Sequence, residues 1–496
     1  MSCPSCGSDA YIKHGIYGLR QRKLCRNCGK TFVDQMLHKS VKSQKLTSKS
    51  YIVTTAINNS KVNKPFWNAI KNYANRNDAK IIVLKCHYRN PTSEKETKNL
   101  EAQEWYDQDL LPFLSDSRLH LGKRLVAMGD IRIVATHSKP LSGWRTASKE
   151  DDAILAHPRI ALETVPTHLG KPAKIIQTTG ACTNPNYSDT NSGHKGKFHH
   201  VLGACIVEIE GSNHFVRHVS AVTDGSFIDL NNRYLADGSV EQLDASVLVL
   251  GDIHAEMVDE NAVIGACDLI ELTKPKYLVL HDVINFGSAS PHSKYFEKFA
   301  RSVQKTDSVL DEIKLTCGLI NDFCQRVGQV IVAQSNHHDH FVAWLEKHDN
   351  ALDLNNALVY HKTKTHVLEC IVAGKEPNPL AYWLKHFHPD LKNITWLSGD
   401  DSFARHGIEY AYHGHRGANG ARGSTKHFAN LGTKLVHGHT HCAQWIDGAQ
   451  AVGTLSQLDM GYNRGSPSGW THSVSLTYSN GKRTLLHLQG KKFYHG

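Results

Sequence analysis

Five apolar runs in the second half of the sequence are each followed directly by side chains that bind divalent metals. A short apolar run bounded by turn residues predicts a buried strand, and open α/β sheets gather their ligands at the carboxyl ends of such strands. In chain order, the residues after the runs are Asp252 and His254, Asp282, Asn336 and His337, His413, and His439 and His441. We therefore expect these side chains to meet at one edge of an α/β sheet.

The order of these clusters resembles that of the calcineurin-like metallophosphoesterase superfamily, which includes the SbcD-type DNA-repair nucleases and the protein phosphatases. The resemblance covers roughly residues 245 to 490 and rests on the motifs GDIH, HD, NH, HG and GHTH. It implies that residues 245–496 form a four-layer α/β sandwich, within a chain of the mixed α/β (α+β) class.

The resemblance also implies two divalent metal ions, taken to be Mn²⁺, that share the carboxylate of Asp282. It assigns to the first ion Asp252, His254, Asp282 and His441, and to the second ion Asp282, Asn336, His413 and His439. The chemistry agrees, because two neighbouring divalent ions need an anionic oxygen ligand between them and mixed nitrogen and oxygen ligands around them. His415 is the alternative to His413, which we prefer because it is closer to the strand end and precedes a glycine.

His337 follows Asn336 directly, and the resemblance implies that it protonates the departing alkoxide. Two departures from the family pattern affect its surroundings. The usual Gly-Asp-x-x-Asp appears as His281-Asp282-Val283-Ile284-Asn285, and the usual Gly-Asn-His-Asp/Glu appears as Ser335-Asn336-His337-His338, with Asp339 one place late. Both changes keep the metal ligands but leave open which group orients His337.

Two Cys-x-x-Cys pairs at the start of the chain predict a separate metal-binding unit. Cys3, Cys6, Cys25 and Cys28 suit one tetrahedral structural Zn²⁺, and a unit this small needs the metal in order to fold. We expect a zinc ribbon over residues 1–35 and a Ser/Lys-rich linker over residues 36–50. The ribbon resembles those that begin some transposases. Its basic residues favour contact with nucleic acid over a purely structural knuckle, and they are Lys13, Arg20, Arg22, Lys23, Arg26 and Lys30.

The region between, residues 51–240, is predicted to be α/β but carries no nucleotide-binding motif that would indicate its role. It opens with an apolar run over 51–57, an amphipathic stretch over 64–76 and a second apolar run over 80–88, which is typical of a βαβ unit. Further along, we expect a long helical stretch over about 292–327 and a C-terminal hairpin that turns at Asn480-Gly481.

Three features favour a nucleic acid as the substrate. The first is the ribbon. The second is an excess of 57 Lys and Arg over 47 Asp and Glu, a formal charge of +10, which favours polyanionic partners. The third is the loop HGHRGANGARGSTK after the fourth run, where Arg416 and Arg422 are the predicted substrate-binding residues. A solvated surface loop is the alternative interpretation of that segment.

We therefore expect a metal-dependent DNA nuclease that hydrolyses phosphodiester bonds with a water activated by two metal ions, anchored to DNA by its ribbon. The layout also loosely resembles the early-gene DNases of large tailed phages, which degrade host DNA. Two alternatives stay open: a phosphatase that acts on nucleotides or other phosphomonoesters, and a non-catalytic accessory protein of DNA processing.

Cellular placement follows from what the sequence lacks. No stretch approaches the ~18 uninterrupted apolar residues of a membrane helix, and the chain begins with cysteines where a signal peptide would have an apolar run. We expect no membrane partner and a reducing cytoplasm, that of the host if a phage encodes the chain. SbcD-type nucleases work as dimers with a partner ATPase, so the formation of a homo-oligomer is left open.

Overall fold

The computed structural model describes residues 3, 5–17, 20–33, 43–88, 104–168 and 170–495. It divides the chain into two compact units, Met1–Gln44 and Lys45–Gly496, which are considered separately. Much of the predicted linker, and the side chain of Arg20, lie outside the described residues. The described part of the predicted linker is not all irregular, because it contains strand β4 (Ser43–Lys45) and the first residue of β5.

The N-terminal unit is a small three-stranded antiparallel sheet with two turns that carry cysteines. Its strands are β1 (Tyr11–Tyr17), β2 (Arg20–Cys25) and β3 (Thr31–Val33). The two turns repeat one geometry, since Gly7 donates its N–H to the carbonyl of Cys3 at 2.8 Å and Gly29 donates to Cys25 at 3.0 Å. Both glycines have a positive φ, +73° and +67°, which glycine adopts without steric cost.

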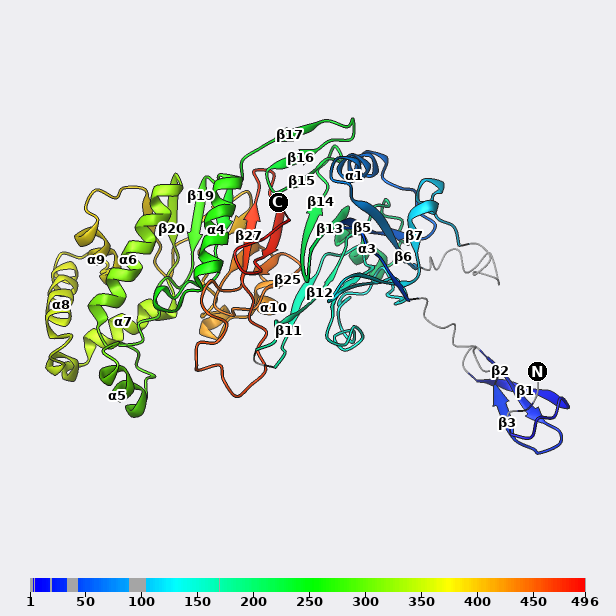
Figure 1. Ribbon diagram of the computed structural model, residues 1–496, viewed down its shortest axis with the longest axis horizontal. Coiled ribbons are helices and arrows are strands. Elements are labelled where there is room, and N and C mark those ends of the chain that lie inside the picture. The colour runs from blue at the N-terminus through cyan, green and yellow to red at the C-terminus, as the bar shows by residue number, and fades with distance from the viewer. Residues whose placement is uncertain are drawn as a thin grey trace. The chain divides into compact units, whose positions relative to one another are not determined.

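A six-stranded sheet forms the centre of the predicted catalytic region, in the order β21-β20-β19-β18-β27-β28 (Figure 1). Its strands are β18 (Val247–Val249), β19 (Tyr277–Leu280), β20 (Gln329–Val332), β21 (Ile394–Trp396), β27 (Ser473–Thr477) and β28 (Arg483–His487). β18 to β21 are parallel, and β27 and β28 form the predicted antiparallel hairpin. β18 and β19 are continuously apolar, and all of their residues except Tyr277 are buried, as expected for strands that are covered on both faces.

Alternate residues of these strands pack into different layers. Leu248 and Leu278 face a cluster made with helices, whereas Val247 and Val279 face a second sheet. This alternation is the period of two that a strand imposes on its side chains. The helices of the first layer are α4 (Glu260–Thr273), α6 (Val309–Arg326), α7 (Asn336–Glu346), α8 (Ala357–Val372) and α9 (Pro379–Phe387), and Figure 1 shows α6, α7, α8 and α9 grouped at the left of the view.

The long helical stretch predicted over 292–327 is instead two helices, α5 (Tyr295–Val303) and α6. The break has a local cause. The side chain of Ser308 accepts a hydrogen bond of 3.2 Å from the N–H of Asp311, which caps the start of α6.

A second, longer sheet joins the two regions that the sequence separates, in the order β22-β23-β24-β26-β25-β11-β12-β10-β9-β8. These strands are β8 (Arg118–Gly122), β9 (Leu125–Met128), β10 (Asp152–Leu155), β11 (Leu162–Val165), β12 (Lys174–Thr178), β22 (Ala404–Arg405), β23 (Ile408–Glu409), β24 (Lys434–His437), β25 (Gln444–Ile446) and β26 (Ala449–Ala451). The junction is the antiparallel pair β11–β25, where Leu162 lies opposite Trp445. The predicted ranges 51–240 and 245–496 thus belong to one compact unit.

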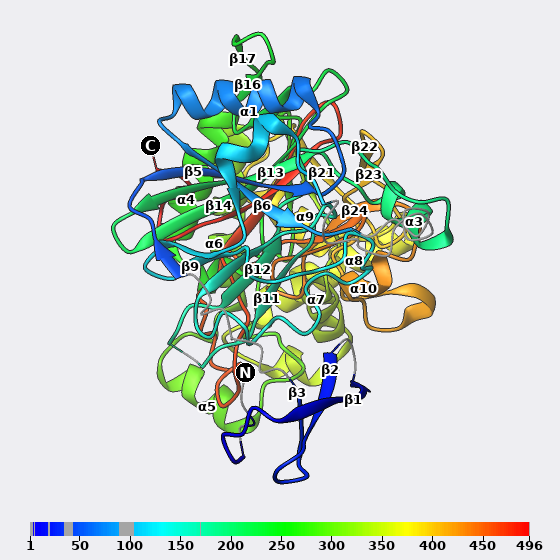
Figure 2. The same ribbon diagram turned by 90° about the vertical axis from the view of Figure 1, so that its right-hand side faces the viewer.

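Residues 51–240 contain a further five-stranded sheet, ordered β14-β13-β5-β6-β7. Its strands are β5 (Ser50–Ile57), β6 (Lys80–Cys86), β7 (Leu114–Ser115), β13 (Gly203–Glu210) and β14 (Asn213–Ser220). β5 and β6 are parallel and joined by α1 (Lys64–Arg76), so the predicted βαβ unit is present. Phe66 and Tyr73 of α1 pack on one face of this sheet, and β8 to β10 pack on the other (Figure 2).

Five further short strands and helices are present. β15 (Phe227–Asp229), β16 (Asn232–Tyr234) and β17 (Val240–Gln242) form a separate antiparallel sheet, and α3 (Asn191–Phe198) and α10 (Thr425–Phe428) are short helices. Among the residues described, no helix combines the length and the apolar character needed to span a bilayer.

Candidate metal centre

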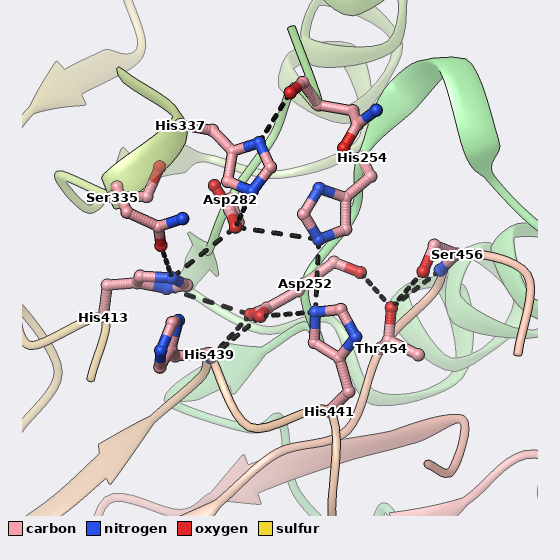
Figure 3. A network of polar contacts seen from close by, with 12 residues as sticks. Asp252, His254, Asp282, Ser335, His337, His413, His439, His441, Thr454 and Ser456 are labelled. Carbon is pink, nitrogen blue, oxygen red and sulfur yellow. Dashed lines mark hydrogen bonds and ion pairs between the residues drawn. The ribbon is translucent and has the colours of Figure 1, made fainter. Parts of the chain in front are cut away.

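The predicted metal ligands come together where strands of two sheets end. Asp252 and His254 follow β18, Asp282 follows β19 and Asn336 follows β20, all from the six-stranded sheet. His413, His439 and His441 come from the longer sheet, after β23 and β24. Figure 3 shows the imidazoles of His254, His337, His413 and His441 turned toward the carboxylates of Asp252 and Asp282.

One group of ligand atoms surrounds Asp252. Nε2 of His441 lies 3.0 Å from Oδ2 of Asp252 and 3.2 Å from Nε2 of His254. Nε2 of His254 is in turn 3.6 Å from Oδ2 of Asp282. These four side chains are the set predicted for the first metal ion.

A second group lies on the other side of Asp282. Nε2 of His413 is 3.6 Å from Oδ2 of Asp282 and 3.2 Å from Oδ1 of Asn336. The same carboxylate oxygen therefore faces both groups. His415 lies outside this group, with its Nε2 atom 3.8 Å from Asp339, so the geometry favours His413 as the ligand.

His439 contacts the site through its main chain, unlike the other predicted ligands. Its main-chain N–H donates to both carboxylate oxygens of Asp252, at 2.8 and 3.1 Å. Its ring lies beside that of His413, with the centroids 5.2 Å apart, and lines the same cavity. The imidazole of His439 is not within the tight clusters that the other histidines form with the carboxylates.

His337 is held so that one ring nitrogen faces the site. Its Nδ1 atom donates a hydrogen bond of 2.6 Å to the main-chain carbonyl of Asn285, which leaves Nε2 3.6 Å from Oδ2 of Asp282. The segment that carries this carbonyl is itself fixed, because the carboxylate of Glu256 accepts from the N–H groups of Asn285 and Phe286 at 2.8 and 3.2 Å. The group that orients His337 is therefore a main-chain carbonyl.

The second departure noted in the sequence, at His338 and Asp339, has a structural role. The ring of His338 accepts a hydrogen bond of 3.2 Å from the N–H of Ser335, which caps the first turn of α7. Asp339 accepts from Gln334 at 2.9 Å and from Arg416 at 2.7 Å. Neither residue holds His337.

The carboxylates of Asp252 and Asp282 are buried without a permanent positive charge. Their side chains are 0% and 2% exposed, and oxygen atoms of the two lie within 4.8 Å of each other. Among the described residues, only histidines pair with them. Two like charges buried this closely need a cation or a proton to offset the loss of hydration.

The burial of the two carboxylates and of the histidines around them shifts their pKa values. Burial, and after it the charge of Asp252, raises the pKa of Asp282 to about 6. Burial also lowers the pKa values of His254 and His413 well below the usual value, so that both imidazoles are neutral at pH 7. Neutral imidazole is the form that offers a lone pair to a metal ion. The donor set of carboxylate, amide and imidazole suits divalent transition metals.

Backbone strain is concentrated at the predicted ligands. His254, Asp282, His439 and His441 have φ values of 48°, 44°, 70° and 54°, in the left-handed region that costs residues with a side chain on the order of 1–3 kcal/mol each. Gly438 shows how tightly the strands approach, because a Cβ atom there would lie 2.2 Å from Oδ1 of Asp252. The GHTH motif needs its glycine for this reason.

A cavity of about 910 Å³ opens onto the site. Its walls include His254, Asp282, Asn336, His337, His439 and His441. Of the two predicted substrate-binding arginines, Arg422 lines this cavity. Arg416 does not line it and pairs with Asp339 instead.

The four predicted zinc ligands also come together. Sγ of Cys3 lies 3.6 Å from that of Cys28, and Sγ of Cys6 lies 3.5 Å from that of Cys25. All four sulfur atoms are within 4.8 Å of one another. A hydrogen bond from the N–H of Cys28 lowers the pKa of the Cys25 thiol to about 6. This arrangement is able to hold one metal ion through four thiolates.

Several residues of the site carry no sequence signal that identifies them. Glu256 lies two places after His254 and has no motif of its own. The carbonyl of Asn285 is a main-chain group, which every residue possesses. Trp470 lies in the cavity wall from a loop far along the chain, and nothing in its sequence context predicts that position.

Comparison with known proteins places the chain in a phage family. No family model matches the sequence. Protein A1 of Escherichia phage T5 is 32% identical over 466 residues, which cover 90% of this chain and 83% of that protein. The chain belongs to the family of phage T5 protein A1. The match extends over most of the chain, so the family shares more than a single motif.

A comparison with solved structures returns Vps29 of Chaetomium thermophilum. The match covers 40% of this chain and 97% of Vps29, at 11% identity and a TM-score of 0.20. At that score the match supports no conclusion about the fold.

Proposed function

We propose that the chain is a two-metal phosphoesterase that hydrolyses the phosphodiester bonds of DNA. The observation that carries this proposal is the position of Asp282, whose Oδ2 atom lies 3.6 Å from ring nitrogens of both His254 and His413. One carboxylate oxygen between two groups of nitrogen and oxygen donors is the arrangement that a pair of divalent ions requires.

The residues divide into two ligand sets. Asp252, His254, Asp282 and His441 would hold one ion, and Asp282, Asn336 and His413 the other, with His439 beside them. When bound, the two ions supply a water of lowered pKa and positive charge against the phosphoryl oxygens. The buried carboxylates would keep the ions in place, and the neutral imidazoles would complete the two ligand sets.

His337 supplies the proton for the leaving group in this proposal. Because Nδ1 is engaged by the carbonyl of Asn285, a second proton on the ring can sit only on Nε2, the atom that faces Asp282 and the cavity. A departing alkoxide placed at the cavity floor would take that proton. Because the ring is already held in one orientation, no entropy has to be lost to orient it during each turnover.

Three features support DNA as the substrate. The four-cysteine unit suits a nucleic-acid anchor, the formal charge is +10, and Arg422 lines the cavity. Membership in the family of a phage protein is consistent with action in the cytoplasm of a phage host.

Incubation of the purified chain with linear and circular DNA tests the proposal. Cleavage is expected with Mn²⁺ and is expected to stop on addition of a chelator. A mononucleotide and p-nitrophenyl phosphate serve as comparison substrates in the same buffer. Rapid hydrolysis of these monoesters without cleavage of DNA would assign the chain to the phosphatases, and no hydrolysis of any of them would assign it to the accessory proteins.

A further inference from the structure

One wall of the cavity is apolar, and the proposed chemistry makes no use of it. The wall consists of Met257, Met460, Tyr462 and Trp470. Tyr462 and Trp470 belong to the segment between β26 and β27, and Tyr462 is 66% exposed. Aromatic rings that face an open cavity offer a large apolar surface for a ligand to cover.

Trp470 connects this wall to the candidate metal site. Its ring stands edge to face against the imidazole of His441, with centroids 4.2 Å apart and an angle of 69°. Tyr462 continues the wall outward, 5.7 Å from Trp470 at 63°. His441 is also the residue whose Nε2 atom lies 3.0 Å from Asp252. A flat group stacked on the wall would thus lie close to His441, which is one of the predicted metal ligands.

The cavity rim also carries three cationic side chains, together with one carboxylate, that of Glu297. Lys294, Arg301 and Arg422 all line it, and cationic side chains of this kind bind phosphate oxygens. The cavity therefore combines three surfaces: metal ligands at its floor, an aromatic wall and a basic rim. A nucleotide strand presents the three matching groups, which are the scissile phosphate, the base and the neighbouring phosphates. Phosphoserine and phosphothreonine have no flat ring to place against the wall.

We propose that Trp470 and Tyr462 form a subsite that stacks the nucleobase adjoining the scissile phosphate. This inference rests on the proposed function and names the form of its substrate. Inside an intact duplex both faces of each base are covered by its neighbours, so a base reaches an aromatic wall only after it leaves the stack. The substrate class is accordingly nucleic acid with an unpaired base at the cleavage position, as in a single strand or a frayed end.

A cleavage experiment tests the subsite with single-stranded oligonucleotides that each carry one abasic residue at a successive position. For the unaltered chain, cleavage next to the abasic residue should slow by about 10-fold, from the usual worth of one base–aromatic stack. Trp470→Ala should cut the strand without an abasic residue about 10-fold more slowly than the unaltered chain does. Its cleavage rate should no longer depend on the position of the abasic residue. Trp470→Phe, which keeps a flat ring, should retain most of the discrimination.

Two further variants distinguish the loss of the subsite from a general loss of structure. Tyr462→Ala removes the outer part of the wall and leaves the Trp470–His441 contact in place. It should show a smaller loss of the same kind. Phe198→Ala removes an aromatic side chain that is 85% exposed on α3, and it should behave as the unaltered chain does.

Equilibrium binding gives a measurement that does not depend on catalysis. Thymidine 5′-monophosphate and 2-deoxyribose 5-phosphate share the sugar and the phosphate and differ in the base. Calorimetry should show the nucleotide bound about 10-fold more tightly, with the preference lost in Trp470→Ala and kept in Trp470→Phe. Equal affinity for the two ligands, or cleavage that is indifferent to the abasic position, would overturn the subsite. A chain that cleaves no nucleic acid yet prefers the nucleotide would overturn the proposed nuclease function and leave the subsite standing.

Discussion

Nδ1 of His337 donates a 2.6 Å hydrogen bond to the main-chain carbonyl of Asn285, and this contact turns Nε2 of the ring toward Asp282. The carbonyl is held in turn by Glu256, which accepts the N–H groups of Asn285 and Phe286. Glu256 thus acts as a positioning residue: it reaches no reacting atom but fixes the direction of His337.

Glu256→Gln should slow DNA cleavage by about 10- to 100-fold, the usual cost of losing an outer partner of a site. A glutamine offers one acceptor oxygen in place of two, so one of the two N–H groups loses its partner. The loss should vanish in a His337→Ala background, because the residue being positioned is absent. Equal losses in both backgrounds would show that Glu256 acts through the fold and not through His337.

Asp282→Asn and His337→Ala should separate metal binding from proton transfer. Asp282→Asn removes the charge shared by both ligand groups, so the purified variant should retain neither Mn²⁺ ion. His337→Ala should retain both ions and slow cleavage by about 10²- to 10⁴-fold, the range of general acid catalysis. Elemental analysis of the two variants beside the unaltered chain makes the comparison. Similar metal loss in both would contradict the role of His337.

Gly438→Ala should abolish cleavage and weaken metal binding, because the added Cβ would lie 2.2 Å from Oδ1 of Asp252. Gly318→Ala is the matched control. Its Cβ would meet nothing within 4 Å, and alanine within helix α6 should raise the free energy of unfolding by roughly 0.5–1 kcal/mol. Cleavage rates and urea unfolding curves of both variants provide the check, and an active Gly438→Ala variant would refute the close approach.

The sequence predicts the parts of this site that are made by side chains, but not those made by main-chain atoms. The ligands Asp252, Asp282 and His413 are predictable because each side chain follows an apolar run, and the ends of neighbouring strands meet in space. The orientation of His337 is not predictable, since the accepting carbonyl of Asn285 has no residue type that marks it. The roles of His338 and Asp339 are not predictable from the motif either, because they depend on contacts with Ser335 and Arg416.

In the fold, likewise, the elements with a local sequence signal are predictable and the long-range strand pairing is not. Helix α1 begins and ends where the amphipathic stretch predicts, because its period is local. The break before α6 also had a local signal, Ser308 followed three residues later by Asp311. The pairing of β11 with β25 had none, because two short strands far apart in the chain pair through the packing of the whole unit.

Buried histidines away from the metal site should make the fold sensitive to acid. Burial lowers the pKa values of His218 and His487 to about 4, against about 6.5 in the unfolded chain. Since the folded pKa lies below the unfolded one, the unfolded state binds more protons between these values. Stability is complete above pH 6.5 and falls as the pH drops toward 4, by about 1 kcal/mol for each histidine at pH 5.5.

Urea unfolding at pH 7.5 and pH 5.5 measures this effect, with a chelator present so that metal binding does not contribute. His218→Gln keeps a donor for the carbonyl of Thr178, which His218 contacts at 2.6 Å, but cannot titrate. It should reduce the difference in unfolding free energy between the two pH values. An unchanged difference would mean that other groups cause the acid sensitivity.

The central claim is that two divalent ions share the carboxylate of Asp282. Anomalous diffraction at the manganese absorption edge, from crystals grown with Mn²⁺, tests it most directly. The account predicts two peaks, one among Asp252, His254 and His441 and one beside Asn336 and His413, with Oδ2 of Asp282 between them. A single peak, or no peak within reach of Asp282, would contradict it.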